Sequence, residues 1–117
     1  MGAMTGMRST MTAVLERNTT IRDGFATEPY ELPWADEARF FVQVLALDPA
    51  DGALEFRTQV SPDGLHWCDL DDHTHRVDAV GLSTWSVSGF GQWLRLRTEP
   101  TGSGAALKVR IYLVGKG

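Results

Sequence analysis

Apolar and polar residues alternate along several short stretches of this chain, as expected for β-strands whose successive side chains point to opposite faces of a sheet. The clearest stretch runs from Ala53 to Ser61, and two others cover residues 92–98 and 107–113. The more apolar faces of these stretches consist of Leu54, Phe56, Thr58, Val60, Leu94, Leu96, Leu107, Val109, Ile111 and Leu113. We therefore predict three strands, each buried on one face and solvated on the other.

The stretch from Ala38 to Leu47 differs because both of its faces are apolar. Alternation with a period of two assigns its residues to two groups, which are Phe40, Val42, Val44 and Ala46 on one face and Phe41, Leu45 and Leu47 with Gln43 on the other. A strand of this kind is typical of a central position beneath a second layer or of a subunit interface.

Turn-forming residues separate the predicted strands. Asp48 to Gly52 and Ser61 to Gly64 each contain a proline and end on a glycine, and two further turns are expected at residues 88–91 and 101–104. These residues favour tight reversals, so we expect hairpins. Less regular strand patterns cover residues 11–17, 20–22, 65–70, 76–80 and 83–88. The sequence predicts an all-β fold, an antiparallel β-sandwich of jelly-roll-like form with about eight short strands joined by hairpins.

The length of 117 residues allows one hydrophobic core, and we predict a single domain over residues 11–117. Residues 1–10 lack the apolar stretch of a signal peptide, so we expect a disordered segment or the remnant of a tag. Cys68 is the single cysteine and has no partner for an internal disulfide, which fits a reducing compartment. We expect a cytoplasmic or virion-associated protein.

Charge and motif content argue against several classes of function. Eleven basic and fifteen acidic residues give a net charge of −4, which leaves no surplus of positive charge to neutralise phosphates. We therefore expect no nucleic-acid partner, and the ordinary hydrophobic content of 43% indicates no membrane partner. The chain contains no nucleophile elbow, phosphate-binding loop or metalloprotease helix motif. We predict a non-enzymatic protein without a cofactor.

Every histidine and the only cysteine lie within residues 66–75. On strands, His66 would share a face with Cys68, and His73 with His75, so two such pairs on adjacent strands could supply four zinc ligands. The spacings are not those of common zinc sites, and the acidic residues between them fit a solvated turn equally well. The metal-binding hypothesis and the turn interpretation both stay open at this point.

Four tryptophans, Trp34, Trp67, Trp85 and Trp93, are many for a chain of this length. Some are expected in the core, since large aromatic side chains dominate buried area. Trp93 falls on the same strand face as Arg95 and Arg97, where an exposed ring would suit a protein interface or a sugar platform.

The segment order over residues 38–117 resembles small β-sandwich proteins encoded among tailed-phage structural genes and in related bacterial loci. The most distinctive feature is the turn Ser61-Pro62-Asp63-Gly64, followed after two residues by Trp67. The resemblance implies a non-enzymatic, oligomerising component of a particle, such as a decoration, head or tail protein. Cys68 and the stretch from Asp71 to His75 depart from what this resemblance leads us to expect.

These observations lead to three hypotheses. The first is a structural or assembly module, forming a homo-oligomer or part of a particle, with Phe41, Leu45, Leu47, Trp85 and Trp93 as interface candidates. The second is a ligand-binding sandwich, carbohydrate-binding in style, with Trp67, Trp85 or Trp93 as the platform. The third is a metal-binding protein that uses His66, Cys68, His73 and His75.

Overall fold

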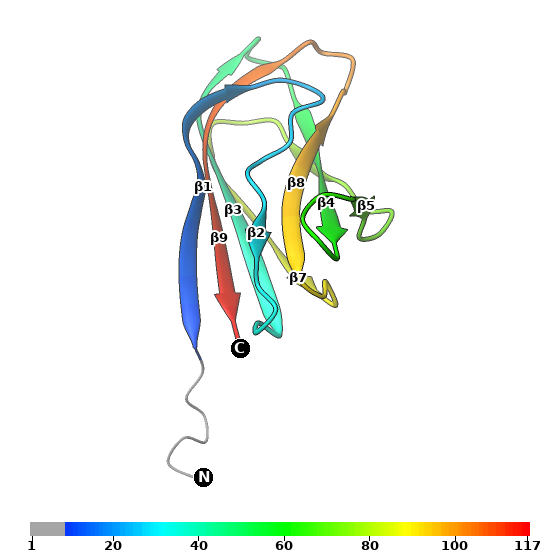
Figure 1. Cartoon of the computed structure of the whole chain (residues 1–117). Coiled ribbons are helices and arrows are strands. Elements are labelled where there is room, and N and C mark those ends of the chain that lie inside the picture. The colour runs from blue at the N-terminus through cyan, green and yellow to red at the C-terminus, as the bar shows by residue number, and fades with distance from the viewer. Residues whose placement is uncertain (1–8) are drawn as a thin grey trace.

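The computed structural model describes residues 9–117, which form two antiparallel β-sheets packed face to face (Figure 1). Its strands are β1 (Thr10–Ile21), β2 (Tyr30–Glu31), β3 (Glu37–Asp48), β4 (Leu54–Ser61), β5 (Cys68–Asp69), β6 (His75–Val77), β7 (Gly81–Ser88), β8 (Trp93–Glu99) and β9 (Ala106–Lys116). This part of the chain contains no helix, and therefore none long and apolar enough to cross a membrane.

The two sheets are interleaved in sequence. Sheet A has the strand order β1-β9-β3-β7, and sheet B has the order β2-β8-β4-β5, with β6 also paired to β4. The chain changes sheet at every connection except the two that join β4, β5 and β6. This wound arrangement of two antiparallel sheets is that of a jelly roll, which confirms the predicted fold class.

The core lies between the sheets and follows the alternation read from the sequence. The inward faces of β4, β8 and β9 are those predicted, and only Val60 among their assigned residues remains half-buried. The largest fully buried side chains come from both sheets and are Phe40, Phe56, Ile21, Leu32, Leu54, Leu94, Leu96, Leu107, Ile111, Leu113, Val42 and Val44. Burial of this apolar surface is the main favourable contribution to folding.

Three of the four predicted hairpins are wrong. The turns at residues 48–52, 88–91 and 101–104 each lead from one sheet to the other, because the strands before and after them belong to different sheets. Only the turn after Ser61 joins paired strands, and there Val60 lies opposite Cys68. Turn chemistry specifies that the chain reverses, but it does not specify whether the next strand pairs with the previous one or packs above it.

A bulge changes the predicted faces of the strand from Ala38 to Leu47. The pairing of β3 with β9 shifts register between Val44 and Ala46. Beyond the shift, Ala46 is exposed and Leu47 is partly buried against the core, the reverse of the prediction. A bulge inserts one residue into the strand and therefore exchanges its faces. Within sheet A, β3 lies between β9 and β7, with one face against the second sheet and the other partly exposed, so a subunit interface on that face stays a prediction.

The N-terminal strand patterns merge. Residues 11–17 and 20–22 were predicted as separate strands, and the structure joins most of them in β1, which shifts register twice against β9. Backbone hydrogen bonds between Ser9 and Gly117 extend this pairing by one residue, so the sandwich begins two residues before the predicted boundary. The rest of the predicted disordered segment, residues 1–8, lies outside the described residues.

Two short elements differ from their predictions. β2 was not predicted, because two residues are too short for a period-two pattern. The strand expected over residues 65–70 shrinks to the two residues of β5, and Leu65 is 78% exposed in the loop before it.

Adjacent phenylalanines on β3 provide a test of the inner and outer faces. Phe40 is fully buried between the sheets, whereas Phe41 is half-buried on the outer face of sheet A. We expect Phe40→Ala to lower the free energy of unfolding by about 3–5 kcal/mol, because it removes core contacts and leaves a cavity. Phe41→Ala should lower the free energy of unfolding by clearly less. Equal losses for the two variants, measured by urea unfolding, would contradict the assigned faces.

Candidate functional site

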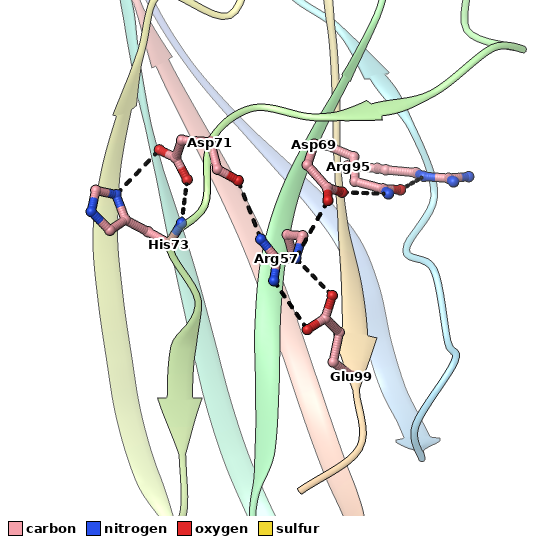
Figure 2. Close-up of polar contacts among 7 residues, drawn as sticks. Arg57, Asp69, Asp71, His73, Arg95 and Glu99 are labelled. Atoms are coloured by element: carbon pink, nitrogen blue, oxygen red, sulfur yellow. Dashed lines mark hydrogen bonds and ion pairs between the residues drawn. The ribbon is translucent and has the colours of Figure 1, made fainter.

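Arg57 organises the outer face of sheet B. Its guanidinium group donates two hydrogen bonds to the carboxylate of Glu99, Nε at 2.6 Å and Nη2 at 3.2 Å, and a third to the carbonyl oxygen of Asp71 at 3.2 Å (Figure 2). Asp69 adds an ion pair at 3.6 Å. Hydrogen bonding to Glu99 is the main reason that the pKa of Arg57 is raised. Arg57 thereby fixes the loop between β5 and β6 against β4 and β8.

The polar contacts continue along β4 toward its end. Gln59 donates a hydrogen bond to Asp69 at 3.0 Å and accepts one from Arg95 at 2.8 Å. The guanidinium carbon of Arg95 also lies 4.4 Å from the centre of the Trp67 ring, within range of a cation–π contact. Burial, with a smaller contribution from Arg97, lowers the pKa of Arg95. The charged groups of this face therefore bind one another and hold the loop.

The Ser61-Pro62-Asp63-Gly64 turn is stabilised by its own side chains. The hydroxyl oxygen of Ser61 accepts hydrogen bonds from the backbone N–H groups of Asp63 and Gly64, at 3.2 and 2.8 Å. The carboxylate of Asp63 accepts bonds from the backbone N–H groups of Leu65 and His66, both at 2.9 Å. The pKa of Asp63 is held well below its usual range, first by the backbone bond from His66 and then by the His66 ring. The motif is a self-contained turn.

The four candidate metal ligands are not brought together. His66 contacts Asp63, with Nδ1 2.7 Å from the carboxylate, while His73 lies 3.5 Å from the carboxylate of Asp71. Cys68 is exposed on β5, and His75 stacks on a core tryptophan. Within residues 9–117, no group of three or more His, Cys, Asp or Glu side chains is arranged to hold a metal ion. The local turn contacts agree with the other interpretation of this segment.

The three candidate sugar platforms differ in burial and in their contacts. Trp85 is 8% exposed, and Trp67 lies beneath Arg95. Trp93 packs under the turn at Gly64, where an added Cβ atom would lie 3.1 Å from its ring. Trp85 is therefore enclosed in the core, whereas Trp67 and Trp93 are half-buried, each with a contact on its ring.

The outer face of sheet A has a different character. Val14, Tyr112 and Phe41 lie side by side on β1, β9 and β3, and Thr84 continues this row on β7. Val14 is 43% exposed, and both aromatic rings are half-buried. We call these four residues the outer row. Arg39 lies on the same face and donates a hydrogen bond to the Thr84 hydroxyl at 3.1 Å.

The five residues that the sequence suggested as interface candidates do not form one surface in the structure. Phe41 belongs to the outer row, and Leu45 is 36% exposed at the bulge of β3. Leu47 packs partly against the core, and the core contains Trp85. Trp93 lies on the other sheet. Sequence reasoning did not select Val14 or Tyr112, although the alternation of Tyr112 with the buried residues of β9 placed it on the outer face.

The fold and these two outer faces define a two-sheet β-sandwich of jelly-roll form. No protein-family model and no curated protein matches the chain. Among solved structures it is similar to the SPBc2 prophage-derived protein YomS, at 8% identity and a TM-score of 0.65, covering 95% of this chain and 96% of that one. This likeness shows a shared fold.

Two further solved structures overlap with most of this chain at lower structural similarity. Pili of Bacillus endospore appendages give 11% identity and a TM-score of 0.38, covering 92% of this chain and 83% of that one. The protein described as STIV MCP gives 13% identity and a TM-score of 0.42, covering 95% of this chain and 48% of that one.

The role of Arg57 in holding the loop can be tested by comparison with Arg97, which lies opposite it on β8. Arg57→Ala removes the bonds to Glu99 and Asp71, and we expect a loss of about 1 kcal/mol in unfolding free energy, since these groups are partly screened by solvent. Hydrogen exchange of residues 68–74 should also accelerate. Arg97→Ala is the control, because Arg97 is exposed, and it should change stability by less than about 0.5 kcal/mol. Equal effects would contradict the role of Arg57.

His75 should make stability depend on pH. Its ring stacks on Trp85 with 4.3 Å between centroids, and burial lowers its pKa below the usual value. The unfolded chain then binds a proton more readily than the folded one, so stability should fall as the pH drops from about 7 through 6.5 and below. His75→Phe keeps a stacking ring without titration and should show a shallower loss in urea unfolding between pH 7 and 5. Identical pH profiles would contradict this assignment.

Proposed function

We propose that the chain is a non-enzymatic assembly module that acts through protein–protein contacts, as a decoration, head or tail component of a phage-like particle. The observation that carries the proposal is the outer row, in which Val14, Tyr112 and Phe41 lie side by side on a face exposed to solvent. Aromatic side chains are enriched at protein interfaces, where they contribute large contact area.

The contrast between the two outer faces supports this choice. On sheet B, Arg57, Gln59 and Arg95 bind one another and the adjacent loop. On sheet A, the equivalent central positions carry Phe41 and Tyr112. One outer face of the sandwich is occupied by its own loop, whereas the other presents the outer row among charged side chains such as Arg39 and Arg110. Association is therefore favoured through the face of sheet A.

Two further points favour a particle component. The fold is shared with a prophage-derived protein, which supports at a coarse level the resemblance to phage structural proteins found over residues 38–117. Jelly rolls also occur in viral capsid domains, although the fold alone hosts many functions. A virion-associated location follows from the proposal.

The test uses the purified chain and the head and tail proteins encoded by neighbouring genes. We expect one of these proteins to bind the chain in biolayer interferometry, and Phe41→Glu to weaken that binding at least tenfold by placing a charge in the outer row. Val14→Glu is a second variant at a more exposed position of the same row.

Leu65→Glu provides the matched control, because Leu65 is 78% exposed in the loop beside sheet B. Its binding should equal that of the original chain, and circular dichroism should show that all variants are folded. Absence of binding to every head and tail protein would overturn the proposed function. Loss of binding in Leu65→Glu, with Phe41→Glu unaffected, would overturn the choice of surface.

A further inference from the structure

The edges of the two sheets are not equally protected. Sheet B ends in very short strands, since β2 and β5 have two residues each and β6 has three. Residues 24–27 also cover β8 through backbone hydrogen bonds to Leu96 and Thr98. Short or covered edges offer few free backbone groups to another strand. Sheet B therefore presents no long edge for pairing.

The β1 edge of sheet A is long but irregular. Its register against β9 shifts twice, between Val14 and Glu16 and again between Glu16 and Thr19. The carboxylate of Glu16 accepts a hydrogen bond from the backbone N–H of Glu28 at 3.1 Å, so the following loop lies against this part of the strand. Bulges and charged side chains are devices that prevent edge strands from pairing with other chains.

The β7 edge has none of these protections. Its eight residues, Gly81 to Ser88, pair with β3 in an unbroken register from Val44 to Glu37. They include no charged residue and no proline, and no other strand of the described chain pairs with β7. Trp85 and Val87 point into the core, whereas Thr84, Ser86 and Ser88 are exposed. A long, regular and uncharged edge is a template for one more strand.

We propose that β7 pairs antiparallel with β7 of a second copy around a two-fold axis, so that two A sheets join into one eight-stranded sheet. This rests on the proposed function, namely assembly through protein contacts, and names a second copy as the partner. A two-fold axis perpendicular to the sheet always places identical edge strands antiparallel to each other. Since β7 is uncharged, no like charges within it meet across the seam.

The alternation of β7 restricts the register of this pairing. Residues opposite each other in an antiparallel pair point to the same face, so inward residues must meet inward residues. Thr84 then lies opposite Thr84 or Ser86 of the copy, and the outer rows of the two copies become neighbours on one continuous face. Dimerisation would thereby double the apolar surface available to a particle protein.

The test compares one substitution on the two edges of sheet A. Ser86→Lys places a charge on the β7 edge, and Thr12→Lys places the same charge on the exposed face of β1. In light scattering coupled to gel filtration, we expect a dimer for the original chain and for Thr12→Lys. Ser86→Lys should raise the dimer dissociation constant at least tenfold, and Leu82→Lys, at a second exposed β7 position, should do the same.

Hydrogen exchange should show that the β7 amides not bonded to β3 are protected in the dimer and exchange faster in Ser86→Lys, with near-ultraviolet circular dichroism unchanged. A monomer at high concentration, or a dimer that both β7 variants leave intact, would overturn the proposal. Protection of β7 only after a particle protein is added would also overturn it, because the edge would then take a strand from that protein. Binding of the monomeric variant to head or tail proteins tests the proposed function separately.

Discussion

The aromatic cluster around Trp85 is the interaction on which the two-layer structure depends. Its ring lies 6.3 Å from Phe40 of β3, 5.9 Å from Phe56 of β4 and 4.3 Å from His75 of β6, measured between centroids. One side chain thus connects sheet A with two strands of sheet B. Its indole N–H is buried without a hydrogen-bond partner in the described structure, at a cost of about 1–3 kcal/mol that the packing offsets.

Packing of the sheets leaves two outer faces with different capacities. On the outer face of sheet B, the charged side chains bind one another in a network centred on Arg57. This network holds the loop between β5 and β6. The face of sheet A carries the outer row and ends at an unprotected edge strand. The proposed assembly uses the face of sheet A, because the side chains of the outer row do not hold a loop of the described chain.

Much of the fold was predictable from local patterns. Alternation along β4, β8 and β9 identified nearly all of the inward residues correctly, because the direction of a side chain relative to its neighbours is set by the strand itself. The positions of the turns were also correct, because proline, glycine, aspartate and serine favour chain reversal locally. The outer-row residue Phe41 was also found, whereas Tyr112 was missed because it follows Lys108 and Arg110 on a face that was interpreted as solvated.

By itself, the sequence determined the all-β class, the alternation of faces and the places where the chain turns. Only the tertiary structure decided which sheet each strand joins, so turns expected to close hairpins became crossings between sheets. It also separated His66, Cys68, His73 and His75 and enclosed Trp85. The physical reason is that local periodicity distinguishes the two faces of a strand, whereas contacts between residues distant in sequence determine which face meets a second layer.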